Sequence, residues 1–475
     1  MNMTRHTTPD EQCRPNDGMH GNLTGSGSPE KNWLIFSYFA NIDGKASSQH
    51  LDDRLPCLRS LGKNPVLLSS VCGERRSDVP HFRVPSIAPS GIRFELRYLK
   101  RRSRALKFAL LPALLTVLPF YFLEKIFMNL ESEWSWFLLA FLRGMHLCKK
   151  FRPETLYSTG GPASAHLAAG LLSLFRKIPW IAELQDPLVF QDWPRSRMAL
   201  KINAALERFI LRRASAVVFL CEGARERAIQ RTGSDPAKAR VIYPGALPVH
   251  EPQAPYVKGE FCRFGHFGSL GGSRDVETFL DALRIVFSNN PDLAGTVRFD
   301  LYGTMDRRSR NLLANFEYPD VIGDHGKISR RDALRAMRKI DVLLLIQNRD
   351  NLSYETIPSK VYEYFQMMRP MLGLVFRNPH LKRMLEDRGH SAAEADSAAD
   401  IAGKVLELLQ RWNGGDFISH GAASSPYTVQ DATEKILALL EDVIRGTPGS
   451  FNPSDENSNG KIFQEKPARR LTPFN

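Results

Sequence analysis

The fold is decided by one stretch, Tyr354-Glu355-Thr356-Ile357-Pro358-Ser359-Lys360-Val361-Tyr362-Glu363-Tyr364-Phe365. Two apolar runs, residues 341–346 and 371–376, flank it and are typical of buried strands. Apolar residues recur at helical spacing as far as Met368, and Pro358 is tolerated in the first turn of a helix. The sequence therefore predicts a strand, a loop, a helix that begins near Pro358 and a second strand.

The start of this helix has the chemistry of a phosphate site. The first turn of a helix leaves backbone N–H groups unpaired, and its dipole end is positive. Ser359 and Lys360 lie in that turn, and Lys360 adds a cation. Glu363 follows one turn later and can bind a pair of hydroxyl groups, while Glu355 lies in the loop before. Together they suit a sugar joined to a diphosphate and a ribose; the alternative is a capped core helix with solvated glutamates.

Length and charge restrict the class of protein. The chain has 475 residues, enough for two substantial domains, and its formal net charge is +13. Such a charge favours an anionic partner. Because no nucleic-acid-binding module is recognisable, an anionic membrane or a phosphorylated substrate is the better interpretation.

The cysteines and the two ends of the chain carry further information. The six cysteines are scattered without a Cys-x-x-Cys pair, which argues against a zinc site and a disulfide scaffold and fits a reducing compartment. Residues 1–31 and 447–475 are polar, and we expect both tails to be disordered.

Residues 32–246 are predicted to form a first α/β domain. A short apolar strand at 33–37 leads to a turn at Gly44, a helix over 47–61 and a second strand at 65–69. This order is the opening of a doubly wound α/β domain. Gly44 either lets a ligand approach the backbone or simply makes a tight turn.

Two later strands of this domain end in polar or glycine-rich turns. One ends at Gly160 and Gly161, and the next ends just before Asp186. Active groups on open parallel sheets lie at the carboxyl ends of strands, so both turns are well placed for a site. Asp186 is a candidate base or substrate-orienting group, or else a helix-capping aspartate.

Residues 106–142 form an apolar segment of a kind that is unusual in a soluble enzyme. The cations Lys100, Arg101, Arg102, Arg104 and Lys107 precede an uncharged run at 108–123. The run is shorter than the roughly 20 residues of a spanning helix, and Pro112 and Pro119 interrupt it. We expect a re-entrant or interfacial segment, with the cations against anionic headgroups at about 1 kcal/mol each. The alternative is that the segment forms core helices.

Residues 260–425 are predicted to form a second α/β domain after a proline-rich linker at 247–259. Its first strand runs into a glycine-rich loop that contains Gly268, Ser269 and Arg274, and a helix follows. Such a loop can hold a diphosphate on its backbone N–H groups. The periodic segment at 426–446 is expected to be a helix that packs back toward the first domain.

These motifs resemble the family 4 glycosyltransferases, in which two glutamates lie eight positions apart across such a turn, here Glu355 and Glu363. The string Pro-Ser-Lys-Val-Tyr-Glu-Tyr is similar to the subgroup that builds bacterial surface polysaccharides. The resemblance implies the α/β GT-B fold, with two facing Rossmann-like domains, the acceptor in the first and the donor in the second, and chemistry in the cleft.

The resemblance also implies roles for particular residues. The donor-binding residues would be Gly268, Ser269, Arg274, Ser359, Lys360 and Glu363; the acceptor-binding residues would be Gly44, Gly160 and Gly161; and the catalytic residues would be Glu355 and Asp186. The chain departs from the family pattern where Ser269 replaces an arginine and Arg274 stands in place of a lysine. Gln185 likewise replaces the arginine that usually precedes Asp186. Such enzymes retain anomeric configuration and need neither a metal ion nor another cofactor.

The expected function is transfer of a hexosyl or N-acetylhexosaminyl group from a nucleotide-sugar to a lipid-linked or oligosaccharide acceptor. It would serve cell-surface polysaccharide or lipopolysaccharide synthesis at the cytoplasmic face of the plasma membrane, with no nucleic-acid partner. The motifs leave the sugar, the acceptor and the linkage open. Two rival classes are a soluble sugar-nucleotide epimerase of similar two-domain plan and a non-enzymatic membrane scaffold derived from a transferase.

Overall fold

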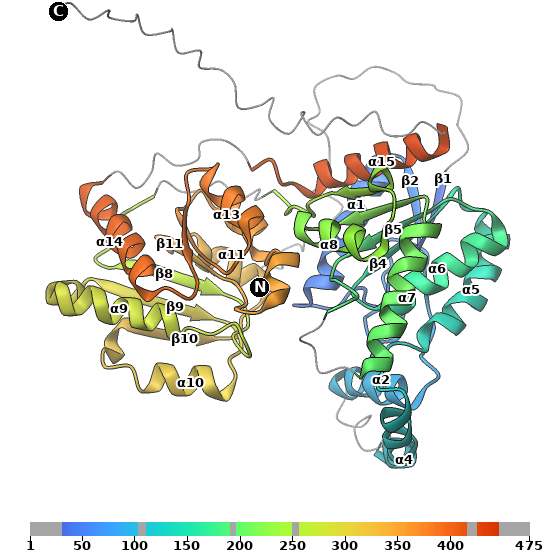
Figure 1. Cartoon of the computed structure of the whole chain (residues 1–475), viewed down its shortest axis with the longest axis horizontal. Helices are drawn as coiled ribbons and strands as arrows, with labels where there is room; N and C mark the ends of the chain where they lie inside the picture. Colours follow the sequence, from blue (N-terminus) through green and yellow to red (C-terminus); the bar gives the residue numbers. More distant parts are fainter. Residues whose placement is uncertain (1–30, 103–110, 191–195, 249–255, 416–424, 446–475) are drawn as a thin grey trace, which may run out of the picture.

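The computed structural model describes residues 31–102, 111–190, 196–248, 256–415 and 425–445. The predicted tails, apart from Lys31, and Cys13 lie outside these residues. The described chain builds two wholly parallel sheets with helices packed on both faces of each (Figure 1).

The first sheet has a doubly wound order. Its strands, from one edge to the other, are β3 (His81–Arg83), β2 (Lys63–Ser69), β1 (Lys31–Phe36), β4 (Thr155–Gly160), β5 (Trp180–Leu184), β6 (Ala216–Phe219) and β7 (Ala239–Val241). The chain moves outward from β1 to β3 and then returns to place β4 on the other side of β1. The crevice at this switch point is where open α/β sheets bind ligands. The turns that follow β1 and β4 therefore lie at the binding edge.

Helices complete the first domain. They are α1 (Ala46–Ser60), α2 (Pro89–Arg102), α4 (Leu111–Phe127), α5 (Trp136–Phe151), α6 (Ala163–Arg176), α7 (Arg197–Arg213) and α8 (Glu222–Thr232), with a 3₁₀ turn η2 (Pro236–Lys238). One face packs α5, α6 and α7 around buried side chains such as Trp136, Leu172 and Ile210. The other face lies under α1 and includes Leu51 and Leu55.

The second sheet repeats this plan. Its strands, in spatial order, are β10 (Ile322–Gly326), β9 (Val297–Tyr302), β8 (Cys262–Phe267), β11 (Val342–Ile346), β12 (Met371–Val375) and β13 (Ser391–Glu394). The switch point lies between β8 and β11. It places the glycine-rich loop after β8 beside the segment that follows β11, which contains both motif glutamates.

Helices and 3₁₀ turns complete the second domain. They are α9 (Glu277–Asn289), η3 (Pro291–Gly295), α10 (Arg307–Ala314), η4 (Pro319–Val321), α11 (Arg330–Met337), η5 (Asn351–Glu355), α12 (Lys360–Phe365), α13 (Pro379–Glu386) and α14 (Ala398–Gly414). Helix α12 begins where the sequence predicts, but its expected continuation to Met368 is wrong. Met368 has a φ of 51° and is exposed, because Pro370 soon forces the chain out of the helix.

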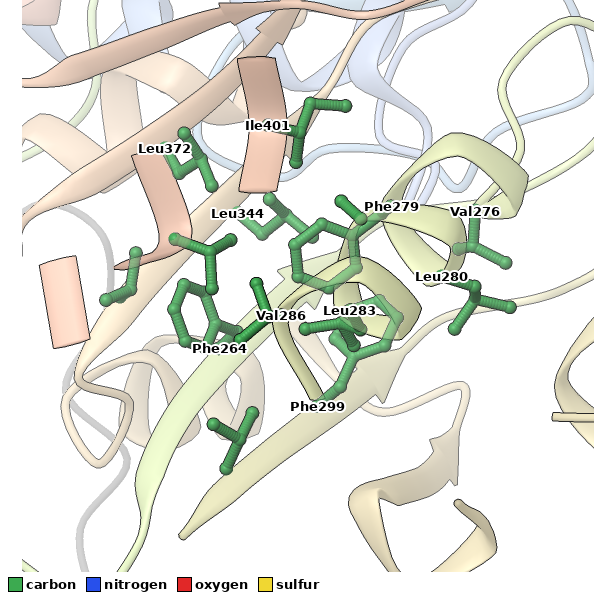
Figure 2. Packing of buried hydrophobic residues seen from close by; sticks show 14 of the residues in the cluster. Phe264, Val276, Phe279, Leu280, Leu283, Val286, Phe299, Leu344, Leu372 and Ile401 are labelled. Carbon is green, nitrogen blue, oxygen red and sulfur yellow. The ribbon is translucent and has the colours of Figure 1, made fainter. Parts of the chain in front are cut away.

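An aromatic core holds β8 in place. Figure 2 shows Phe264 and Phe299 from the sheet packed against Phe279 and Val286 of α9. The Phe279 and Phe299 ring centroids are 4.8 Å apart in an edge-to-face arrangement. Such pairs add to the free energy gained from burying apolar area. The strand that leads into the glycine-rich loop is therefore firmly anchored.

The last described helix, α15 (Val429–Arg445), belongs by its packing to the first domain, and Figure 1 shows it beside α1. Ala432, Ile436 and Leu440 are buried against the core face under α1. The chain returns at Ala246, whose N–H donates to the Tyr427 carbonyl at 3.0 Å. Both chain crossings between the domains therefore meet at one point.

Within the apolar segment, α4 is a continuous helix and not one broken by proline. Helix α4 runs through Pro119, and Pro112 lies in its first turn, where an N–H has no helical partner. Leu115, Phe120, Phe122, Leu123, Ile126 and Phe127 are between 51% and 75% exposed. The interpretation of this stretch as core is therefore wrong for residues 115–123; residues 108–110 lie outside the described part. Helix α5 is different, since it buries Trp136 and Ala140 while Leu138 and Leu142 face outward.

Helix α2 ends at Arg102, so Lys100, Arg101 and Arg102 form its last turn. Arg104 and Lys107 lie outside the described residues. Across the described ranges, no helix combines the length and the apolar character that a membrane crossing requires.

Candidate functional site

Two adjoining cavities, of about 300 and 230 Å³, lie between the domains at the carboxyl ends of both sheets. Residues that line both cavities come from each domain: Ala46, His50, Pro244, Phe267, Gly268, Ser359 and Lys360. The two switch points therefore face one another across a shared cleft.

The start of α12 has little helix dipole to offer, because the helix is only six residues long. The amide of Val361 donates to the Pro358 carbonyl at 3.0 Å, and that of Tyr362 donates to Ser359 at 3.3 Å. Within the described part of the chain, the amides of Ser359 and Lys360 make no such bond. A phosphate here would rely on these two N–H groups and on nearby cations, and not on a long macrodipole.

Glu363 is held by three donors. Lys360 Nζ lies 2.8 Å and Arg330 Nε 2.9 Å from its carboxylate, and Gln49 Nε2 of the first domain donates at 3.1 Å. Burial opposes ionisation, but Lys360 and Arg330 outweigh it and lower the pKa of Glu363. Arg330 also pairs with Asp53 of α1 at 2.9 Å. Glu363 is therefore an ionised carboxylate within a network that joins the domains.

Glu355 is 3% exposed and ends the 3₁₀ turn η5. Arg227 Nη1 lies 3.1 Å and Arg231 Nη2 3.3 Å from its carboxylate, and both arginines come from α8 of the first domain. Arg231 also pairs with Glu207 at 2.8 Å. Glu355 thus lines the cleft as predicted by its place in the motif, but its carboxylate is engaged by the opposite domain.

Arg274 lines the same cavity as Glu355, Ser359 and Lys360. Its Nε atom is buried without a hydrogen-bond partner, and burial lowers the pKa of the guanidinium. An unpaired buried donor costs free energy, so an anionic ligand would relieve it. Arg274 is therefore suited to a phosphate.

The glycine-rich loop is tightly constrained. A Cβ at Gly303 would lie 1.9 Å from the Gly268 carbonyl oxygen, so these two loops touch backbone to backbone. Ser269 accepts a hydrogen bond from Thr304 Oγ1 at 3.0 Å and lines the second cavity. The loop therefore presents backbone and hydroxyl groups to the cleft, without the cation that an arginine at position 269 would supply.

Gly44 lies in the cleft with a φ of 71°. The ammonium of Lys327 from the second domain is 3.7 Å from the position where a Cβ of Gly44 would stand. A side chain here would be both strained and in contact with the opposite domain. Gly44 therefore fits a close approach across the cleft better than an isolated turn.

Asp186 lines the larger cavity and remains accessible to solvent there. The protein atoms around its carboxyl group displace water from it, and this desolvation, followed by the charge of Glu131, raises the pKa of the group. Gly160 and Gly161 line neither cleft cavity, but a Cβ at Gly161 would lie only 2.6 Å from Asp186 Oδ2. Gly161 thus makes room for Asp186, and a raised pKa suits a carboxylate that exchanges protons.

Sequence reasoning missed several residues of the cleft. His50 lines both cavities, and burial lowers its pKa to about 4, so the ring is neutral near pH 7. The one feature of the sequence that could have indicated His50 as a cleft residue is its position in the helix after the Gly44 turn. Arg227, Arg231 and Arg330 were also missed, because their partners lie far away in sequence.

A buried polar layer supports the floor of the cleft. Glu183 contacts Arg54, Tyr157 and Thr159, all of them buried. Gln185 Nε2 donates to Thr159 Oγ1 at 2.9 Å. This bond fixes the side-chain amide of Gln185, the residue before Asp186. Among the described residues, no group of three or more His, Cys, Asp or Glu side chains is arranged to hold a metal ion.

Comparison with known proteins agrees with this architecture. Residues 66–245 match the family model of the glycosyl transferase 4-like domain, which spans the first sheet from β2 to the turn after β7. A search of curated protein sequences found no match.

Three solved structures illustrate the structural likeness. A UDP-forming alpha,alpha-trehalose-phosphate synthase from Burkholderia xenovorans aligns with a TM-score of 0.59 at 12% identity, covering 88% of this chain and 100% of that one. The lipopolysaccharide outer core galactosyltransferase WaaB in its apo form aligns with a TM-score of 0.52 at 10% identity, covering 88% and 99%. A candidate UDP-N-acetylglucosamine 2-epimerase from Listeria monocytogenes aligns with a TM-score of 0.51 at 12% identity, covering 90% and 100%.

At such low identities the likeness shows the fold alone. The predicted fold class, an α/β GT-B arrangement of two Rossmann-like domains, is confirmed. Because an epimerase shares it, the fold by itself does not separate transfer from epimerisation.

Proposed function

We propose that this chain is a retaining glycosyltransferase that moves a hexosyl or N-acetylhexosaminyl group from a nucleotide-sugar donor to a saccharide acceptor. The observation that carries the proposal is the cleft, where Arg274, Lys360 and Glu363 of the second domain face Gly44 and Asp186 of the first. The glycosyl transferase 4-like match over the first domain supports the same reading.

The donor would lie on the second domain. Its diphosphate would be bound by the amides of Ser359 and Lys360, by the Gly268–Ser269 loop and by the Arg274 guanidinium. Glu363 would accept hydrogen bonds from the ribose hydroxyls, and Glu355 would support the donor sugar. Fixed N–H groups and cations that face the leaving diphosphate stabilise negative charge as it develops, which is electrostatic catalysis.

The reaction breaks the bond between the anomeric carbon and the diphosphate oxygen and forms a bond from that carbon to an acceptor hydroxyl oxygen. We propose attack on the face from which the diphosphate leaves, so that configuration is retained. The hydroxyl proton passes to the departing diphosphate oxygen or to Asp186. Gly44, Gly160 and Gly161 would shape the acceptor side, and we expect no metal ion or other cofactor.

We further propose that the acceptor is linked to a lipid and that the enzyme attaches to the inner face of the plasma membrane in bacterial polysaccharide synthesis. The support is the exposed apolar face of α4, next to the basic end of α2. Exposed apolar patches of this kind are rare on soluble monomers and suit a membrane surface. A soluble sugar-nucleotide epimerase has no need of it.

The test is a donor screen followed by a transfer assay. Nucleotide-sugars are first ranked by thermal shift, and the best donor is then incubated with membranes that contain lipid-linked saccharides. We expect sugar transfer with retained anomeric configuration, read by NMR. Conversion of the donor sugar to its epimer without transfer would identify an epimerase, and binding without turnover of any donor would identify a scaffold.

A further inference from the structure

A third cavity, of about 490 Å³, lies at the β3 edge of the first sheet and shares no lining residue with the cleft. Three arginines from three segments converge on it: Arg75 from the loop after β2, Arg83 at the end of β3 and Arg143 from α5. Val71, Phe82 and Val84 complete an apolar floor.

No lining residue of this cavity carries a carboxylate. Among the described residues, Arg75 and Arg143 form no ion pair, and the Arg143 guanidinium lies over the Phe82 ring with its carbon 5.0 Å from the centroid. Arg83 donates one N–H to the Gly73 carbonyl at 2.9 Å, which orients its guanidinium. Within the described part of the chain, Arg75 and Arg143 therefore bring two unneutralised positive charges to the cavity, and the guanidinium of Arg83 lies beside them.

The remaining polar groups nearby are already occupied. His81 is bonded on both ring nitrogens, to Ser69 Oγ at 2.7 Å and to the Arg76 amide at 3.0 Å. Burial first, and then the neighbouring arginines, lower the pKa of His81 to about 4, so it is neutral. Asp78 and Asp52 both pair with Arg76, at 2.7 and 3.1 Å, and neither lines the cavity.

We propose that this cavity is a binding site for a phosphate-bearing anion. The planar fork of arginine matches phosphate oxygens and binds them with two parallel hydrogen bonds, and the apolar floor strengthens the attraction by excluding water. The phosphate belongs to a lipid headgroup or to a soluble diphosphate. Leu138 and Leu142 are exposed on α5, the helix that also carries Arg143, and they suit the apolar chain of a lipid.

The site makes a prediction that is independent of the function proposed for the cleft. Hydrogen exchange is measured on the full chain with inorganic pyrophosphate and, separately, with vesicles of phosphatidylglycerol in phosphatidylcholine. We expect slower exchange over residues 71–84 and in α5. The double variant Arg75→Gln/Arg143→Gln should lose about tenfold or more in affinity at this site, because charge-assisted hydrogen bonds are removed.

The matched control is Arg307→Gln/Arg310→Gln in α10, which removes the same charge from exposed positions of the second domain. Unchanged exchange elsewhere shows that each variant is folded. Protection by pyrophosphate alone supports a soluble phosphate, protection by vesicles alone supports a lipid headgroup, and protection by both supports either source. Protection by neither, or equal protection in the Arg75/Arg143 variant, would overturn the proposal.

Discussion

Each of the two motif glutamates in the cleft is bonded by donors from other elements. The carboxylate of Glu363 accepts hydrogen bonds from Arg330, Lys360 and Gln49. That of Glu355 pairs with Arg227 and Arg231. A ribose that binds Glu363 must therefore share or replace existing donors. Donor affinity is then set by an exchange of hydrogen bonds within the cleft and not by the formation of entirely new ones.

Glu363→Ala should weaken nucleotide-sugar binding by about 1–3 kcal/mol, because charged hydrogen-bond partners lose their acceptor. Isothermal titration calorimetry with the preferred donor measures the change. Glu355→Ala should mainly lower turnover. The control is Asp53→Asn, which removes a partner of Arg330 but leaves the Glu363 carboxylate in place. If Glu363→Ala binds donor as tightly as the wild type does while folded, the donor-site assignment is wrong.

If Asp186 accepts the proton of the acceptor hydroxyl, as proposed, the rate of transfer depends on pH. Because its pKa is raised, the ionised form is lost at a higher pH than for an ordinary carboxyl group. We expect kcat/KM to fall as the pH drops through that raised pKa, and Asp186→Asn to be slow with this acidic limb abolished. A profile that keeps the same acidic limb in Asp186→Asn would assign the proton to the leaving diphosphate.

The sequence predicts residues that are neighbours in a motif better than residues that meet only in the fold. Glu355, Ser359, Lys360 and Glu363 lie within nine positions, so the turn itself indicates their shared site. His50 has no such signal, since its importance arises from a cleft assembled by two sheets. The ion pairs of Glu355 have no signal in the motif either, because α8, more than a hundred residues earlier, supplies its arginines.

At the scale of elements, apolar runs locate the strands well because parallel strands are buried on both faces. Strand β3 escapes this pattern, as its three residues are His, Phe and Arg at a sheet edge. Helix α4 also differs from the prediction that its prolines interrupt it. A proline in a surface helix costs one hydrogen bond but need not end the helix. Polar edge strands and exposed apolar helices thus defeat prediction from periodicity alone.

Helix α4 should anchor the protein by apolar contact. Replacing Phe120, Leu123 and Ile126 with Ser should make vesicle binding salt-labile, because salt screens charges over about 8 Å at physiological ionic strength but does not weaken apolar insertion. Changing Arg101 and Arg102 to Glu should weaken binding at low salt. Both effects are read by vesicle sedimentation at low and high salt.

The comparison for the α4 variant is Val257→Ser/Ile444→Ser, which removes exposed apolar side chains elsewhere. Because the α4 side chains are exposed, the melting temperature should not change. If the wild-type protein does not bind anionic vesicles at low salt, the proposed membrane attachment is wrong and a soluble acceptor is favoured.

Across the whole molecule, ion pairs on both sides of the cleft hold the domains together. Arg330 joins Asp53 to Glu363, and Arg227 with Arg231 joins α8 to Glu355. Both networks end on the two motif glutamates. If the donor binds to these carboxylates as proposed, its binding is coupled to domain closure.

Asp53→Asn combined with Arg227→Gln should loosen this closure. We expect a larger radius of gyration by small-angle X-ray scattering, with the same shift in wild type at high salt, since both remove attraction between partly exposed charges. Arg284→Gln/Arg308→Gln, which breaks pairs inside the second domain, should leave the radius unchanged. Equal radii for all three proteins would show that the ion pairs do not set the distance between the domains.

The return of α15 to the first domain has a consequence for synthesis on the ribosome. Ala432, Ile436 and Leu440 cover a core face whose other residues, such as Leu51 and Leu55, emerge nearly four hundred residues earlier. That face stays uncovered until the second domain has been translated. Since domains otherwise fold one after another as they emerge, the nascent first domain depends on a segment that arrives last. A chain released early, even one cut after an intact second domain, would therefore leave its first domain unfinished.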